Sequence, residues 1–184
     1  MAKNRETYGI DIAGIHRELE LFEIKPGLKI AILNILGDVE LVEACARALA
    51  DKLADTNYDV LVTAEAKSIP IAHDLAAETG KPYVILRKAY KPYMGEALES
   101  ETLSITTGKP QTLFLDEKDH ALINGKRVVI VDDVISTGST LQGMRMIIEK
   151  AGGTIAAEAA ILTEGERAKW ADIISLGHLP VFSD

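Results

Sequence analysis

Short apolar runs alternate along the chain with longer amphipathic stretches. The runs are rich in Val, Ile and Leu, which predicts buried strands at Leu28–Leu33, Val60–Val62, Tyr83–Leu86, Arg127–Val131 and Ile155–Leu162. Between them, apolar residues at helical spacing predict helices at Val39–Leu53, Ser68–Thr79 and Gly138–Ala151. This alternation predicts the α/β class, with a doubly wound, mostly parallel sheet and flanking helices.

The N-terminal segment precedes the first strand of this pattern. From Tyr8 to Phe22, apolar residues recur at helical spacing, which predicts a helix. Lys25-Pro26-Gly27 follows and is typical of a break between elements. Residues 1–27 are therefore expected to form a small helical hood.

A second segment, Lys88 to Leu115, is poorer in apolar residues and richer in turn formers. Alternation at Thr102–Thr106 and at Gln111–Leu115 predicts a hairpin there. We expect residues 88–115 to be a flexible lid on a single domain that comprises residues 1–184.

Composition excludes several classes of partner. The formal net charge of −8 argues against a nucleic-acid or anionic membrane surface, so an anionic ligand needs a local site. No apolar run approaches the ~18 residues of a membrane span, and no apolar leader segment is visible. Cys45 is the single cysteine and cannot form an internal disulfide. A cytoplasmic protein that binds no membrane and no nucleic acid is expected.

One stretch carries most of the candidate chemistry. An apolar strand ends in Asp132 and Asp133 and turns through Ser136–Thr140 into a helix. Ligands of parallel sheets lie beyond the carboxyl ends of the strands, and the first backbone N–H groups of a helix are unpaired and bind anions. The hydroxyl side chains add donors, and Gly138 permits close backbone approach. The pattern predicts a sugar phosphate, with its hydroxyls near the two carboxylates.

This stretch resembles the signature of type I phosphoribosyltransferases that binds phosphoribosyl pyrophosphate (PRPP). The similarity extends from about Lys25 to Leu162 and is closest to adenine phosphoribosyltransferases, then to xanthine phosphoribosyltransferases. It implies that Asp132 and Asp133 are catalytic. It also implies that the 5-phosphate of PRPP is bound by Ser136, Thr137, Gly138, Ser139 and Thr140.

Two further segments resemble the parts of that family which hold pyrophosphate. Ala64-Glu65-Ala66-Lys67-Ser68 is similar to the family's pyrophosphate loop, which tends to contain a non-proline cis peptide. Arg87 and Lys88 follow a strand and would repel each other unless an anion lay between them. The resemblance implies pyrophosphate contacts from Glu65, Ala66, Lys67, Ser68, Arg87 and Lys88. It also implies Mg²⁺ as cofactor, held mainly by PRPP and water, with no direct protein ligand.

The base site matches neither family fully. Adenine enzymes carry a lid glutamate where this chain has Thr106, although Glu99 or Glu101 could replace it. The segment Leu33 to Asp38 instead matches the Leu-Asn-x-x-x-Asp pattern of the xanthine enzymes. The candidate base contacts are Ile30, Asn34 and Val134.

The resemblance as a whole implies a reaction of purine salvage. The 5-phosphoribosyl group of PRPP would pass to a purine base, adenine before others, giving a nucleoside monophosphate and pyrophosphate. Xanthine or another base is an alternative, and so is a non-enzymatic regulator that senses PRPP on the same fold. Analogy with the fold suggests a homodimer.

Overall fold

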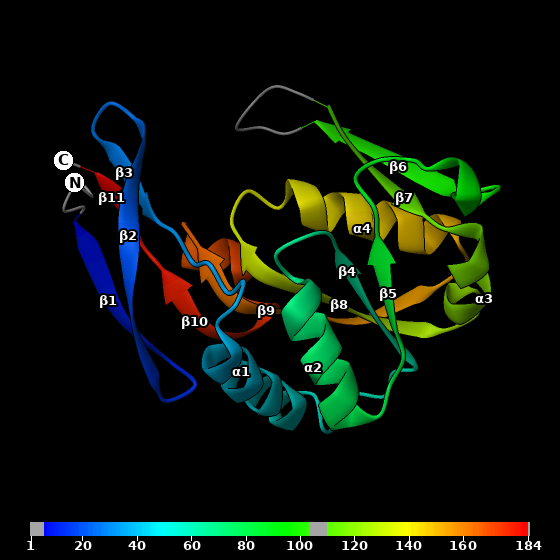
Figure 1. Ribbon diagram of the computed structural model, residues 1–184, viewed down its shortest axis with the longest axis horizontal. Helices are drawn as coiled ribbons and strands as arrows, with labels where there is room; N and C mark the ends of the chain where they lie inside the picture. The colour runs from blue at the N-terminus through cyan, green and yellow to red at the C-terminus, as the bar shows by residue number, and fades with distance from the viewer. Residues whose placement is uncertain (1–5, 104–109, 184) are drawn as a thin grey trace.

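The computed structural model describes residues 6–103 and 110–183, and its centre is a parallel sheet (Figure 1). Its five strands lie in the order β10-β9-β8-β4-β5, and every neighbouring pair is parallel. The strands are β4 (Val60–Ala64), β5 (Tyr83–Leu86), β8 (Arg127–Ile135), β9 (Thr154–Glu164) and β10 (Ile174–Leu179). The parallel sheet predicted from the sequence is confirmed.

Helices cover both faces of this sheet. Leu61 and Val129 belong to the apolar cluster of α1 (Val39–Lys52) and α2 (Ile69–Thr79). Their neighbours in sequence belong to the opposite cluster, with α4 (Ser139–Lys150). Because successive side chains of a strand point to opposite faces, the sheet is doubly wound, as predicted. The short helices are η1 (Pro92–Met94), η2 (Glu117–Asp119), α3 (His120–Ile123) and η3 (Arg167–Trp170).

The predicted hairpin pairs β6 (Leu98–Leu103) with β7 (Pro110–Leu115) and packs on α4. Ser100 Oγ donates to the Gly143 carbonyl at 2.8 Å, and a Cβ on Gly143 would lie 3.0 Å from Leu113. Gly143 therefore allows the hairpin to approach the helix closely. The first strand begins earlier than the alternation at Thr102–Thr106 indicated, and residues 104–109, with Thr106, lie outside the described residues.

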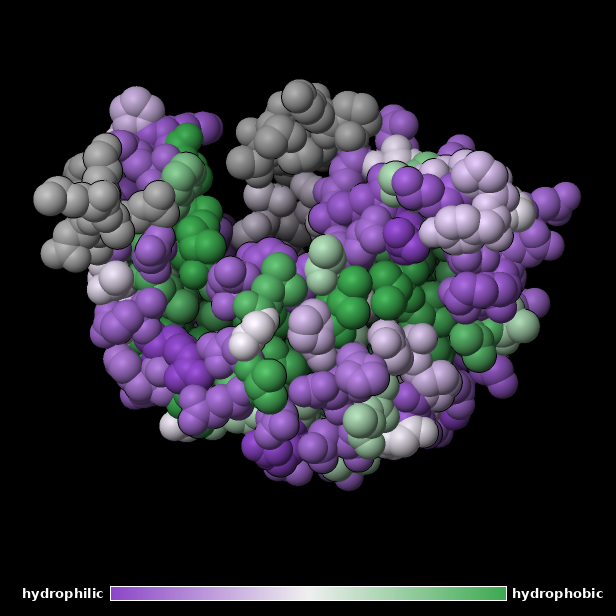
Figure 2. Space-filling view, viewed as in Figure 1, coloured by the Kyte–Doolittle hydropathy of each residue, from purple (hydrophilic) through white to green (hydrophobic). Residues whose placement is uncertain are grey.

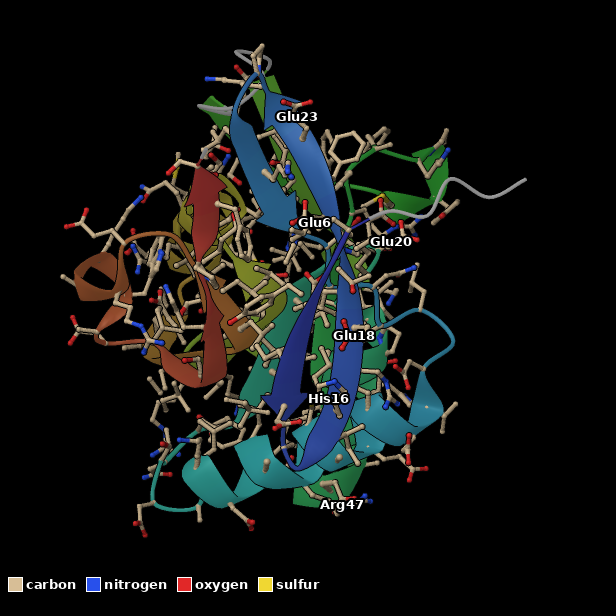
Figure 3. The ribbon with its side chains drawn as sticks, turned by 90° about the vertical axis from the view of Figure 1, so that its left-hand side faces the viewer. Glu6, His16, Glu18, Glu20, Glu23 and Arg47 are labelled. Carbon is tan, nitrogen blue, oxygen red and sulfur yellow. The ribbon has the colours of Figure 1, made fainter. Side chains whose placement is uncertain are left out.

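The N-terminal hood is a sheet, so the predicted helix over Tyr8–Phe22 is wrong. An antiparallel sheet forms in the order β1-β2-β3-β11, in which β3 pairs with the C-terminal strand β11. Its strands are β1 (Thr7–Ile12), β2 (Ile15–Lys25), β3 (Leu28–Ala31) and β11 (Val181–Ser183). One side of the hood carries His16 and several glutamates and faces outward (Figure 3).

Among the described residues, no helix has both the length and the apolar character needed to cross a membrane.

Candidate functional site

The loop between β8 and α4 forms a small hollow at the carboxyl end of the sheet. We call Ser136–Thr140 the phosphate loop; all five residues line the hollow, of about 40 Å³, together with Asp132. Gly138 begins α4 with a left-handed φ of 85°, which glycine adopts without strain. The Thr137 and Ser139 hydroxyl oxygens lie 3.1 Å apart. The structure thus brings together every residue predicted to bind the 5-phosphate.

The two aspartates lie directly before this loop. Asp132 and Asp133 are 7% and 9% exposed, and the Asp133 backbone N–H donates to Asp132 Oδ1 at 2.9 Å. Burial, followed by the neighbouring Asp133 carboxylate, raises the pKa of Asp132 above its usual range. Since the ionised pair is costly to keep out of water, a cationic group placed against it would be favoured.

Lys67 connects the predicted pyrophosphate loop to this pair. Its Nζ lies 3.3 Å from Asp133 Oδ2 and donates to the Leu33 carbonyl at 2.7 Å. The Glu65–Ala66 peptide is cis, as the resemblance implied. The Ser68 hydroxyl donates to the Ala64 carbonyl at 2.7 Å and accepts from the Thr63 hydroxyl at 2.9 Å, so this side chain is engaged within the protein.

The Glu65 carboxylate accepts hydrogen bonds from the Arg87 side chain and from the Lys88 backbone. Arg87 Nε lies 2.7 Å from Glu65 Oε2, and the Lys88 N–H donates to Glu65 Oε1 at 2.6 Å. Burial raises the pKa of Glu65, but the bonds from Lys88 and Arg87 outweigh it and the pKa is lowered. The Arg87 guanidinium is therefore paired within the protein, whereas Lys88 contacts Glu65 through its backbone N–H and not through its ammonium group. The Glu65 carboxylate is turned toward Arg87 instead of being a free contact for pyrophosphate.

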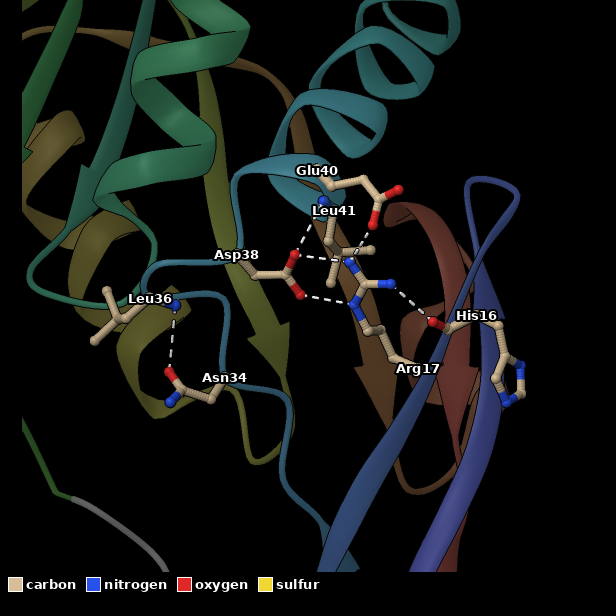
Figure 4. A network of polar contacts seen from close by, with 7 residues as sticks. All are labelled: His16, Arg17, Asn34, Leu36, Asp38, Glu40 and Leu41. Carbon is tan, nitrogen blue, oxygen red and sulfur yellow. Dashed lines mark hydrogen bonds and ion pairs between the residues drawn. The ribbon is translucent and has the colours of Figure 1, made fainter.

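The three candidate base contacts do not converge. Asn34 is exposed, accepts the Leu36 N–H through Oδ1 at 3.3 Å, and lines a hollow of about 650 Å³ beside β2 (Figure 4). Ile30 and Val134 do not line that hollow. Ile30 lies in the hood opposite Phe22. Val134 packs on the α1 and α2 cluster and lines the small hollow of the phosphate loop. The space-filling view shows the surface hollowed beside the hood, with apolar residues on the hood's side (Figure 2).

An arginine from the hood fixes the segment that carries Asn34. The Arg17 guanidinium makes two 2.8 Å bonds to the carboxylate of Asp38, and the same carboxylate accepts the Leu41 N–H at the start of α1 (Figure 4). Arg17 also lowers the pKa of Asp38. Sequence reasoning missed this contact, because Arg17 and Asp38 are 21 positions apart and no motif joins them.

Sequence reasoning also missed Lys169 and Trp170. Lys169 Nζ donates to the Thr137 carbonyl at 3.0 Å, and the Trp170 ring lies against Gly138. No signal in the sequence indicated that the segment after β9 reaches the phosphate loop.

The chemistry of the donor set is compatible with a Mg²⁺ ion that takes most of its ligands from substrate and water. Within residues 6–103 and 110–183, no group of three or more His, Cys, Asp and Glu side chains is placed to hold a metal ion. The Asp132 and Asp133 carboxylates are hard oxygen donors of the kind that Mg²⁺ accepts in small number.

Comparison with protein families gives one match that spans most of the chain. Residues 33–174 match the family model described as "Phosphoribosyl transferase domain". Among curated proteins, the hypoxanthine/guanine phosphoribosyltransferase of Methanosarcina mazei is 36% identical over 131 residues, 70% of this chain and 64% of that protein. The purine biosynthesis transcriptional repressor PurR of Bacillus subtilis is 28% identical over 161 residues, 88% of this chain and 53% of the repressor. The chain thus spans less than two thirds of the length of these curated relatives.

Solved structures share the fold. The adenine phosphoribosyltransferase of Thermoanaerobacter pseudethanolicus superposes with a TM-score of 0.72 at 27% identity, covering 87% of this chain and 95% of that one. The enzyme of Giardia lamblia, solved with 9-deazaadenine, gives a TM-score of 0.70 at 19% identity, with 87% and 93% covered. The second likeness supports the fold alone.

Proposed function

The chain belongs to the phosphoribosyltransferase family, and from this premise we propose that it transfers the 5-phosphoribosyl group of PRPP to a purine base. The observation that carries the proposal is the contact of Lys67 with Asp133. It joins the segment that resembles the pyrophosphate loop to the acidic pair beside the phosphate loop. A ligand with a phosphate at one end and a pyrophosphate at the other would span this edge of the sheet.

Each part has a separate task in this reaction. The phosphate loop binds the 5-phosphate and positions the ribose through contacts remote from the reacting carbon. The bond from C1 to the pyrophosphate oxygen breaks with its electron pair on oxygen, while a purine nitrogen bonds to C1 and the proton lost from the purine passes to water. Lys67 and Arg87 stabilise the charge that develops on pyrophosphate, and Asp132 and Asp133 stabilise the positive charge on the ribosyl ring. Bound Mg²⁺ would supply further neutralisation of the pyrophosphate.

For the base, we propose a 6-oxopurine such as hypoxanthine or guanine, although the sequence resemblance pointed first to adenine. Oδ1 of Asn34 accepts the Leu36 N–H, and the amide N–H₂ supplies two donors for a ligand. An N–H₂ group can donate to the 6-oxo group of such a base, whereas toward adenine it can donate only to a ring nitrogen. The curated relatives of higher identity are named for hypoxanthine and guanine, which supports the same choice.

The test is pyrophosphate release from PRPP and Mg²⁺ with adenine, hypoxanthine, guanine and xanthine supplied singly. We expect kcat/KM for hypoxanthine to exceed that for adenine by at least about tenfold. Asn34→Asp replaces the donor by an acceptor and should reduce this ratio about tenfold or more. Asn57→Asp, at an asparagine remote from the site, is the matched control. Release with adenine alone would refute the choice of base and leave the transferase standing.

A second candidate is a regulator that binds PRPP without turnover. The similarity to the PurR repressor over 88% of the chain is the observation that favours it. PRPP binding detected by calorimetry, with no pyrophosphate release for any base, would replace the enzyme by this function. The expected homodimer remains a proposal, which light scattering in solution would test.

A further inference from the structure

The helix η3, between β9 and β10, contacts the phosphate loop. In Figure 1 the chain between these strands lies next to the loop that leads into α4. Lys169 and Trp170 line a second hollow, of about 430 Å³, together with Thr137, Gly138 and Ser139. Neither of them lines the 40 Å³ hollow. The η3 side chains therefore contact the loop outside its 40 Å³ hollow, which we call the inner hollow.

Lys169 controls the orientation of one peptide group. Its Nζ donates to the Thr137 carbonyl at 3.0 Å, and that carbonyl shares a planar peptide with the Gly138 N–H. This peptide is trans, since the single cis bond among the described residues is Glu65–Ala66. In a trans peptide the C=O and N–H point in opposite directions. Because Lys169 holds the carbonyl, the Gly138 N–H is directed away from Lys169, and backbone N–H groups of such a loop bind phosphate.

Trp170 sets how far the loop can move outward. A Cβ on Gly138 would lie 2.7 Å from Trp170 Cη2, so the ring is packed directly against the glycine. The ring is fixed in turn, because Nε1 donates to the Glu164 carbonyl at 2.9 Å and the side chain is 9% exposed. Lys169 Nζ also lies 4.5 Å from the Trp170 ring centroid, a cation–π distance that couples the two side chains.

We infer that Lys169 and Trp170 are positioning residues of the phosphate loop, which hold the Gly138 peptide in the orientation that binds the 5-phosphate of a phosphoribosyl ligand. This inference rests on the proposed function. Neither side chain reaches the inner hollow, so both act through the loop. Their removal should weaken binding of the phosphate and leave the chemical step of bound substrate largely unchanged.

The first test measures affinity for ribose 5-phosphate by calorimetry and the KM for PRPP, in the full chain. Lys169→Met and Trp170→Leu should each raise both constants about tenfold, with kcat at saturating PRPP within about twofold of the wild type. Trp170→Phe keeps an aromatic ring and should restore part of the affinity. Lys118→Met removes a lysine that pairs with Asp119 far from the loop, and it should leave both constants unchanged.

The second test uses Trp170 as a reporter, because it is the single tryptophan of the chain. Ribose 5-phosphate should change its emission in a saturable manner, whereas ribose without phosphate should not. Lys169→Met retains the chromophore and should shift the midpoint to higher ligand concentration. Unchanged affinity in both Lys169→Met and Trp170→Leu would overturn the inference while leaving the transferase intact. Failure of the wild type to bind PRPP or ribose 5-phosphate would overturn the proposed function as well.

Discussion

Protein stability and the proposed reaction favour different protonation states of the Asp132 carboxyl group. It is buried beside Asp133, and both burial and the neighbouring charge raise its pKa. Its ionised form is therefore disfavoured in the free protein, although the proposed reaction uses that negative charge to stabilise a ribosyl cation. Because the ionised carboxylate is disfavoured in the free protein, a cationic transition state beside it is stabilised by the favourable interaction of opposite charges.

Replacement of Asp132 by asparagine should raise stability and abolish most turnover. The folded-state pKa is raised, so the wild type loses stability as pH rises above the unfolded pKa of about 3.9. The neutral amide of the Asp132→Asn variant has no such loss, while its Oδ1 can still accept the Asp133 N–H. The melting temperature of the variant should exceed that of the wild type at pH 7, and the difference should vanish below about pH 4. Turnover should fall about 100-fold or more.

Thermal melts from pH 3 to 8, with kcat measured at pH 7.5, test both parts of this prediction. Asp51→Asn, at an exposed aspartate of α1, is the control and should change neither quantity. A variant that is less stable than the wild type at pH 7 would show that the carboxylate is well solvated or well paired. Wild-type turnover would remove Asp132 from the mechanism.

For single residues, the sequence predicted functional groups that are neighbours along the chain, but it did not predict contacts between residues that are far apart in the sequence. Asp132, Asp133 and the phosphate loop lie on one strand and the turn after it, so their proximity follows from local geometry. Lys169 reaches Thr137 across 32 positions, and its role depends on how η3 packs. Likewise, no spacing rule could indicate that the Glu65 carboxylate faces Arg87.

The hood shows how one pattern of apolar residues can predict the wrong element. Apolar residues at helical spacing were counted across Ala13-Gly14, which form a turn with positive φ at both residues. On either side of that turn the true period is two. Leu19 is buried while Phe22, assigned to the same helical face, is 51% exposed. The helices α1, α2 and α4 were predicted to within one or two residues because no turn interrupts their pattern.

The contact of β2 with the start of α1 should contribute stability that depends on pH. The Arg17 bond holds the pKa of Asp38 below its usual range. A lowered carboxyl pKa stabilises the fold above the unfolded value of about 3.9, and this stability is lost as pH falls through the folded value. Arg17→Leu should therefore lower the melting temperature at pH 7, with a difference from the wild type that shrinks below about pH 4.

Arg47→Leu is the matched control, because Arg47 lies 3.7 Å from Glu43 in an exposed pair on α1. Exposed helical pairs contribute little, so this variant should melt close to the wild type. Equal effects of the two substitutions at pH 7 would mean that the Arg17 bridge does not anchor the hood.

On the scale of the molecule, the doubly wound topology gathers segments that are far apart in sequence at one edge. Lys67 follows β4, Arg87 follows β5 and Asp133 lies near the end of β8. Parallel strands place these positions together, which is why the fold class and the proximity of most candidate phosphate-binding residues could be predicted from the sequence. The part of the candidate site next to the base could not be predicted in this way, because it depends on the hood, whose sheet combines strands from the two ends of the chain.

A protein of net charge −8 that binds a highly anionic ligand beside two aspartates should depend on a cation to do so. PRPP at 100 times its Kd adds about 2.7 kcal/mol to the free energy of unfolding. For a chain of this size, that free energy corresponds to a rise in melting temperature of roughly 5–10 °C. We expect this rise with PRPP and Mg²⁺ together, and a much smaller one when EDTA replaces Mg²⁺.

Mg²⁺ without PRPP is the control and should leave the melting temperature unchanged, because the described residues offer no cluster that holds a metal ion. Equal stabilisation by PRPP in Mg²⁺ and in EDTA would show that Lys67, Arg87 and the phosphate loop balance the ligand charge without a metal ion. Mg²⁺ would then be needed, if at all, for the departure of pyrophosphate, and the metal dependence of kcat at saturating PRPP would measure that separate contribution.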